Sequence, residues 1–113
     1  SWGGIRHPFV AYIRADAKES ELRWLHERGM IGCFFGVESG NETYRNQVLG
    51  KNLYDKDIFR TVGMLNEMGV LFMASYMRGT PEETWELQGE TAKFAEDLGG
   101  YPIVYNYESL AVG

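Results

Sequence analysis

The sequence predicts an α/β fold whose elements follow the order β-α-β-α-β-α-β. Short runs rich in β-branched and aromatic residues alternate along the chain with amphipathic stretches, in which apolar residues recur at helical spacing. Glycines and capping residues separate the two kinds of segment. Because a helix lies between successive strands, the strands should pair in parallel through right-handed crossovers. Four such strands form either a small open sheet or an arc of an α/β barrel.

The first predicted strand is a short run rich in β-forming residues that spans Phe9 to Arg14. Asp16 and Glu19 follow at the spacing of a capping box, which predicts a helix that begins there and ends at Gly29. The second predicted strand spans Ile31 to Val37 and is bounded on both sides by glycine or capping residues.

Two helices are expected between the second and third strands. Ser39 and Glu42 are spaced to cap a short one, which Gly50 ends. Asp55 is placed to cap a longer one. The apolar stripe that this longer helix should bury consists of Ile58, Val62 and Leu65.

The third predicted strand, Val70 to Met77, is almost wholly apolar. Thr80 to Glu83 then predict a helix start, with Thr as the cap, Pro at the first helical position and Glu at the third. This helix runs to Leu98 and precedes a fourth strand, Pro102 to Tyr107. Strands that are apolar on both faces are typical of a sheet that is covered on both faces.

Composition and charge exclude several classes of protein. The chain carries 11 basic and 16 acidic residues, and its net charge of −5 argues against charge-driven binding to nucleic acid or to an anionic membrane. No apolar run approaches the roughly 20 residues of a membrane-spanning helix. Cys33 is the single cysteine, so neither an internal disulfide nor an all-cysteine metal site can form. These features predict a cytoplasmic protein.

The length of 113 residues suits one domain or part of one. The chain begins at Ser1 without an initiator methionine and stops shortly after an apolar segment. We therefore interpret residues 1–113 as an internal piece of a larger domain.

Polar side chains follow every predicted strand at its carboxyl end. The four strand ends read Arg14-Ala15-Asp16, Glu38-Ser39-Gly40-Asn41, Tyr76-Met77-Arg78-Gly79-Thr80 and Asn106-Tyr107-Glu108-Ser109, and each includes charged or amide-bearing side chains. Ligands bind at this edge of parallel sheets and barrels. Period-two alternation places Glu38 and Arg14 at the mouth of a barrel, where a carboxylate can accept hydrogen bonds from a ribose diol and a guanidinium can hold a carboxylate. The same pattern also fits strands that simply end where solvent begins.

Four short motifs resemble the middle of radical SAM enzymes, and most closely the branch that often carries a cobalamin-binding domain. The resemblance covers roughly Phe9 to Leu98, and it is the combination and spacing of the motifs that make it specific. The motifs are Gly36-Val37-Glu38-Ser39-Gly40-Asn41, Gly50-Lys51, Gly69-Val70 and Gly79-Thr80-Pro81-Glu82-Glu83-Thr84.

The resemblance implies a partial parallel (β/α) barrel that binds S-adenosylmethionine (SAM) at the carboxyl ends of its strands. Glu38, with Ser39 beside it, matches the position that contacts the SAM ribose. The strand end that carries Tyr76, Arg78 and Gly79 matches the one that lies along the adenine. Arg14 lies where a contact to the methionine carboxylate can form. No catalytic residue and no metal ligand is assigned within the chain.

The sequence departs from the family pattern at the cluster-binding loop, the first two barrel strands and one glycine of the last motif. The CxxxCxxC loop that ligates the [4Fe–4S] cluster is absent, as are the first two barrel strands, and both are expected before Ser1. Glu82 replaces a glycine of the last motif. The resemblance therefore implies a cluster supplied by a missing upstream segment, which cleaves SAM to a 5′-deoxyadenosyl radical, and it leaves open a cobalamin in a separate domain.

The expected partners are the remainder of the parent enzyme and a substrate that the sequence does not identify. Open strand edges at both ends of the arc also predict self-association of the isolated chain. Two alternatives remain at this stage: a non-catalytic α/β module that binds a nucleotide at the same rim, and another α/β-barrel enzyme that matches the motifs by chance.

Overall fold

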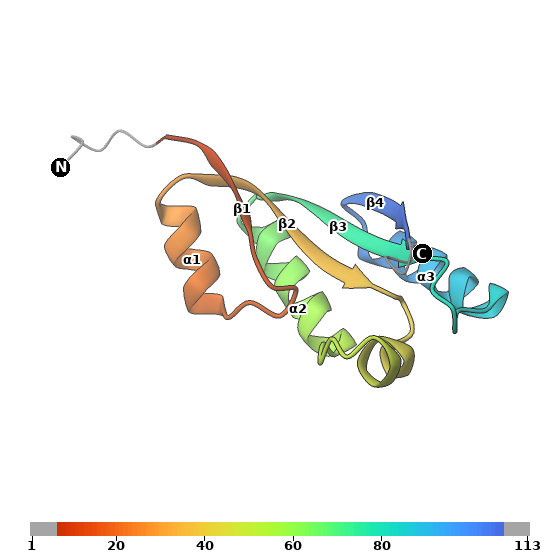
Figure 1. Ribbon diagram of the computed structural model, residues 1–113. Coiled ribbons are helices and arrows are strands. Elements are labelled where there is room, and N and C mark those ends of the chain that lie inside the picture. The colour runs from red at the N-terminus through yellow and green to blue at the C-terminus, as the bar shows by residue number, and fades with distance from the viewer. Residues whose placement is uncertain (1–6, 108–113) are drawn as a thin grey trace, which may run out of the picture.

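The computed structural model describes residues 7–107, and Figure 1 shows their arrangement. Glu108 and Ser109, expected at the polar end of the fourth strand, and the chain start at Ser1 lie outside these described residues. The elements are β1 (Phe9–Tyr12), α1 (Glu19–Glu27), β2 (Met30–Glu38), the π-helix η1 (Tyr44–Val48), α2 (Asp55–Glu67), β3 (Leu71–Arg78), α3 (Trp85–Leu98) and β4 (Tyr101–Asn106).

The four strands form one parallel sheet in the order β1-β2-β3-β4. The predicted α/β fold and its element order are therefore confirmed, with the short helix as a single π-helical segment. When each right-handed crossover returns to the next strand along, every helix falls on the same side of the sheet. Figure 1 shows the helices together beneath the sheet. This is the arrangement of a barrel arc, not of a doubly wound open sheet.

The core lies between the helices and one face of the sheet. We call this the outer face; β2 contributes Cys33, Phe35 and Val37 to it, and β3 contributes Phe72, Ala74 and Tyr76. Leu22, Ile58 and Leu65 of the helices, each with no exposed surface, pack against these strands. Burial raises the pKa of the Cys33 thiol to about 11, so this cysteine is an inert core residue.

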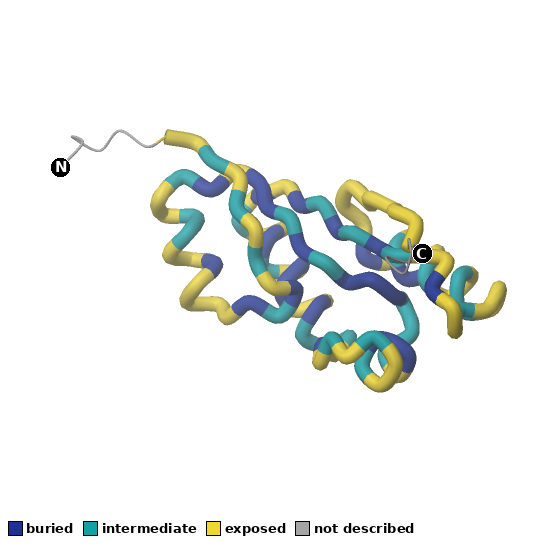
Figure 2. Tube along the Cα trace, viewed as in Figure 1, coloured by how far each residue is buried: buried dark blue, intermediate teal, exposed yellow. Residues whose placement is uncertain are grey.

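The opposite face of the sheet has no helix against it within residues 7–107. This inner face carries Tyr12, Phe34, Met73, Ser75, Ile103 and Tyr105, which are half-buried or exposed. Tyr12 is 85% exposed and stacks on Phe34 with ring centroids 5.4 Å apart. The expected covering of both faces is therefore wrong for this chain. β4 is exposed along its whole length, as Figure 2 shows, so neither face of this strand is covered within the described residues.

The helices do not begin as predicted, because the polar side chains expected to cap them form other contacts. α3 begins at Trp85 and not near Pro81, since Thr84 is the residue whose side chain accepts the N–H of Leu87, at 3.2 Å. Thr80 is buried and contacts the hydroxyl of Tyr44. Glu83 Oε1 accepts the N–H of Gly79 at 2.7 Å, which holds the preceding turn.

The remaining predicted N-terminal caps are also wrong. Asp16 does not cap α1, because its carboxylate pairs with Arg14. Asp55 lies inside the first turn of α2 and pairs with Arg45. At the turn before η1, Asn41 and not Ser39 accepts the N–H of Tyr44, at 2.8 Å.

Both edge strands expose backbone groups, and we predict that the isolated chain self-associates. On β1 the N–H groups of Phe9 and Ile13 point to the β2 side, where they donate to Gly29 and Phe34, so those of the intervening even-numbered residues face away. Size-exclusion chromatography with light scattering should show dimers or larger species. A Val10→Lys change, which adds charge at a half-exposed edge position, should shift the population towards monomer. A wild-type chain that elutes as a monomer at all concentrations would contradict the prediction.

Candidate functional site

Glu38 ends β2 in an unusual backbone conformation. Its φ is 70°, in the left-handed region, and the N–H of Ser39 donates to the carbonyl of Val37 at 2.9 Å. This hydrogen bond closes a γ-turn around Glu38, a form with positive φ that is rare and strained. The register with β3 shifts at the same point, between Gly36 and Glu38. Such strain in a residue other than glycine persists where surrounding contacts hold it, and it often marks a functional site.

The carboxylate of Glu38 folds back over the inner face and reaches across β3. Ser75 of β3 lies 3.5 Å from Oε1, and the hydroxyl of Tyr105 on β4 donates to Oε2 at 2.5 Å. The ammonium of Lys51 lies 4.0 Å from Oε2. A Cβ at Gly36 would lie 3.7 Å from the Glu38 carboxyl carbon, at ordinary van der Waals distance. Although Glu38 is only 8% exposed, its charge is therefore paired and hydrogen-bonded.

A pocket of about 430 Å³ opens on the inner face around this carboxylate. Its walls include Tyr12, Phe34, Glu38, Lys51, Ile103 and Tyr105. Aromatic and aliphatic walls with a few convergent polar groups are typical of small-molecule sites of this size. The apolar walls suit a planar base, and the carboxylate suits a pair of hydroxyl groups.

Of the predicted site residues, Glu38 alone lines this pocket. Arg14 is exposed and its Nε lies 2.9 Å from Asp16 Oδ1, so in this structure it forms an ion pair with Asp16. Tyr76 projects from the outer face, where burial raises its pKa to about 12 and its hydroxyl has no hydrogen-bond partner among the described residues. These two positions do not converge with Glu38, and their binding roles remain predictions.

The other three predicted residues also have structural partners. Ser39 has no exposed surface, and its hydroxyl accepts the N–H of Asn41 at 3.2 Å. Arg78 donates from Nε to Asn106 Oδ1 at 2.9 Å, which joins the ends of β3 and β4. Gly79 has a φ of 87°, which explains a glycine there without a ligand. Their proximity to a ligand is not tested by this geometry.

Sequence reasoning did not assign Tyr105, Ser75 or Lys51 to the site. Alternation along β3 places Ser75 on the inner face with Met73, and the pairing of Ile103 with Ser75 places Tyr105 there too. A small polar residue in an otherwise apolar strand is the signal that could have identified Ser75. Tyr105 could be found only once the register of β4 was known.

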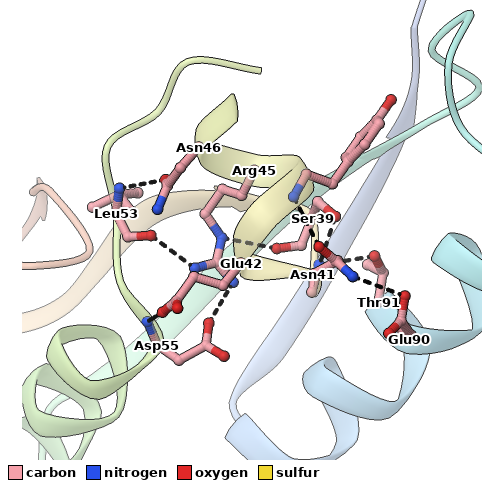
Figure 3. A network of polar contacts seen from close by, with 11 residues as sticks. Ser39, Asn41, Glu42, Arg45, Asn46, Leu53, Asp55, Glu90 and Thr91 are labelled. Atoms are coloured by element: carbon pink, nitrogen blue, oxygen red, sulfur yellow. Dashed lines mark hydrogen bonds and ion pairs between the residues drawn. The ribbon is translucent and has the colours of Figure 1, made fainter. Parts of the chain in front are cut away.

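A buried arginine anchors the loop that follows Glu38 (Figure 3). Arg45 has no exposed surface, and it donates from Nε to the Ser39 carbonyl and from Nη1 to the Leu53 carbonyl, each at 2.9 Å. Its Nη2 lies 2.8 Å from Asp55 Oδ1. One guanidinium thus ties the end of β2 to the start of α2, and the site depends on this anchor for its position.

Gly40 is required by the packing of α3 and not by a ligand. A Cβ at Gly40 would lie 2.6 Å from both the Cβ of Phe94 and the Cα of Thr91. The N–H of Gly40 donates to Thr91 Oγ1 at 2.8 Å. The close approach of α3 therefore explains why a glycine stands at this position.

Nothing in residues 7–107 groups three or more His, Cys, Asp or Glu side chains as a metal site. Cys33 lies in the core on the outer face, away from the pocket. The described part of this chain therefore does not fit an iron–sulfur cluster. No helix within the same range is long and apolar enough to cross a membrane.

Several solved structures that resemble this chain are radical SAM enzymes. Coproporphyrinogen III oxidase (HemN) from Escherichia coli, a radical SAM enzyme, aligns with a TM-score of 0.83 and 20% identity over 91% of this chain and 24% of its own. The radical SAM methyltransferase TsrM from Kitasatospora setae, with cobalamin and a [4Fe–4S] cluster bound, aligns with a TM-score of 0.75 and 19% identity over 86% of this chain and 20% of its own.

The cobalamin-dependent SAM radical enzyme OxsB, with aqua-cobalamin and SAM bound, aligns with a TM-score of 0.64 and 19% identity over 88% of this chain and 16% of its own. The chain thus spans a quarter or less of the length of these enzymes. No family model matches the sequence, and no curated protein matches it. The likeness confirms the predicted fold, an arc of a parallel (β/α) barrel.

Replacing Gly40 with alanine should destabilise the protein by roughly 1–3 kcal/mol or more, because the added methyl group overlaps the backbone of α3. Gly89→Ala is the matched control: Gly89 lies within α3 with no atom close to an added Cβ, so alanine should stabilise by about 0.5–1 kcal/mol. Urea unfolding of both variants measures the difference. Equal midpoints for the two variants would show that the close approach at Gly40 carries no cost.

Arg45→Met should lower the free energy of unfolding by roughly 2–4 kcal/mol, because two carbonyls lose their donor in the interior. Arg23→Met is the control: Arg23 forms an exposed pair with Glu19, and its loss should cost less than about 0.5 kcal/mol. Denaturant unfolding compares the two. A loss at Arg45 no larger than that at Arg23 would remove this anchor from the account.

Proposed function

We propose that this chain is the SAM-binding segment of a radical SAM enzyme. The observation that carries the proposal is the carboxylate of Glu38, held by a strained turn at the carboxyl end of β2 and directed into a pocket on the inner face of a barrel arc. The fold likeness to HemN, TsrM and OxsB supports it.

In this proposal the chain binds and orients SAM. Glu38 accepts hydrogen bonds from the two ribose hydroxyls, and the apolar walls formed by Tyr12, Phe34 and Ile103 exclude water from the nucleoside. Cysteines in an upstream segment of the parent would hold a [4Fe–4S] cluster, which would supply one electron for the cleavage of SAM into methionine and a 5′-deoxyadenosyl radical. We assign no catalytic residue within this chain.

The remainder of the parent enzyme is then the first partner of this chain, since it must supply the cluster and complete the barrel. Two of the similar structures are described with cobalamin, which supports a cobalamin-binding domain as an optional part of that parent. A cytoplasmic location belongs to the same proposal and is supported by the single, unpaired cysteine Cys33.

The decisive variant is Glu38→Gln in the full-length protein with its cluster in place. Glutamine keeps the size of the side chain but loses the charged acceptor, so the Kd for SAM should rise roughly tenfold or more. Calorimetry measures SAM binding, and denaturant unfolding measures stability. Glu21→Gln, at an exposed position of α1, is the control and should bind SAM as the wild type does.

Unchanged SAM affinity in Glu38→Gln would make the ribose assignment wrong. A variant that fails to fold would instead identify Glu38 as a structural residue of the sheet. Tight binding of a nucleotide other than SAM by a full-length protein without cluster cysteines would favour the non-catalytic nucleotide-binding module.

A further inference from the structure

Tyr105 is joined to Glu38 across the width of a strand. Tyr105 lies on β4 opposite Met77 of β3, whereas Glu38 ends β2 on the other side of β3. The hydroxyl of Tyr105 nevertheless donates to Glu38 Oε2 at 2.5 Å, because Ser75 is the small side chain that lies between them. This is a contact between residues 67 positions apart in the sequence.

The strand pairing does not require this hydrogen bond. β4 already pairs with β3 over six residue positions, from Met73–Tyr101 to Arg78–Asn106. Tyr105 is 40% exposed, whereas Glu38 is 8% exposed. The carboxylate of Glu38 is far more buried and needs donors to offset its loss of hydration. The contact therefore serves the carboxylate more than it serves the strand.

Tyr105 is suited to remain a donor. Burial, followed by the hydrogen bond to Glu38, raises the pKa of the Tyr105 hydroxyl above its ordinary value. The phenol therefore keeps its proton at neutral pH and continues to donate to the carboxylate. A phenol with this fixed role restricts the rotation of a glutamate side chain that would otherwise sample several rotamers.

The hydrogen bonds leave acceptor sites on both carboxylate oxygens. A carboxylate has about four lone-pair sites, two on each oxygen. Tyr105 uses one on Oε2, and Ser75 approaches one on Oε1. One further site on each oxygen remains for the pocket, which matches the two hydroxyls of a ribose diol.

We propose that Tyr105 is a positioning residue for nucleoside binding: its hydroxyl holds Glu38 in the orientation in which both carboxylate oxygens face the ribose hydroxyls. The inference rests on the proposed function, since it concerns the same pocket. Tyr105 then contributes to nucleoside affinity only through Glu38, and this contribution disappears when the Glu38 carboxylate is removed. Binding benefits because the orientation is set before the ligand arrives.

The test is a double-mutant cycle in the full-length protein with its cluster in place, with SAM as the probe. Tyr105→Phe removes only the hydroxyl, and the Kd for SAM should rise roughly three- to tenfold. In a Glu38→Gln background the same change should alter the Kd by less than about twofold. Tyr101→Phe is the control: Tyr101 lies on the same strand and face, is 59% exposed, and has no hydroxyl hydrogen bond within residues 7–107.

Each outcome decides the matter. Unchanged SAM affinity in Tyr105→Phe overturns the inference. An equal loss of affinity in the Glu38→Gln background also overturns it, because Tyr105 would then act on the ligand by another route. A Tyr105→Phe protein that does not fold also overturns it, since the residue is then structural; Ser75→Ala, which removes the other donor, checks Glu38 positioning independently. Wild-type protein that does not bind SAM refutes the proposed function itself.

Discussion

Each crossover in this chain returns to the adjacent strand on the same side, and this topology places all the helices on one face of the sheet. The core therefore forms only between the outer face and the helices. The inner face keeps its aromatic and polar side chains free to line a pocket. A doubly wound sheet of the same strands would have covered this face, so the site exists because the strand order is sequential.

Four consecutive residues at the end of β2 enter four different environments. Val37 is fully buried in the outer-face core, and Glu38 turns back into the inner-face pocket. The carbonyl of Ser39 accepts a hydrogen bond from the buried Arg45, and Gly40 lies against α3. The γ-turn at Glu38 makes this divergence possible, because it reverses the direction of the chain within three residues. The Arg45 anchor and the α3 contact then hold the strained turn in place.

The strands were predictable to within a few residues because β-forming runs and terminal glycines are local signals. The helix starts were not, because a capping residue competes with tertiary partners: Thr80 is buried against Tyr44, and Asp55 pairs with Arg45. Glu38 could be placed at the site because it directly follows an apolar strand. Tyr105 and Arg45 could not, since the first depends on the register of β4 and the second is a charge that sequence patterns assign to the surface.

The central claim is that the Glu38 carboxylate on the inner face of the arc receives the ribose of SAM. A crystal structure of the full-length protein with its cluster and SAM tests this claim most directly. The account predicts both ribose hydroxyls within roughly 3 Å of the Glu38 carboxylate oxygens, with the adenosyl group against the inner face. A ribose bound elsewhere, with Glu38 still engaged only by Tyr105, Ser75 and Lys51, would contradict it.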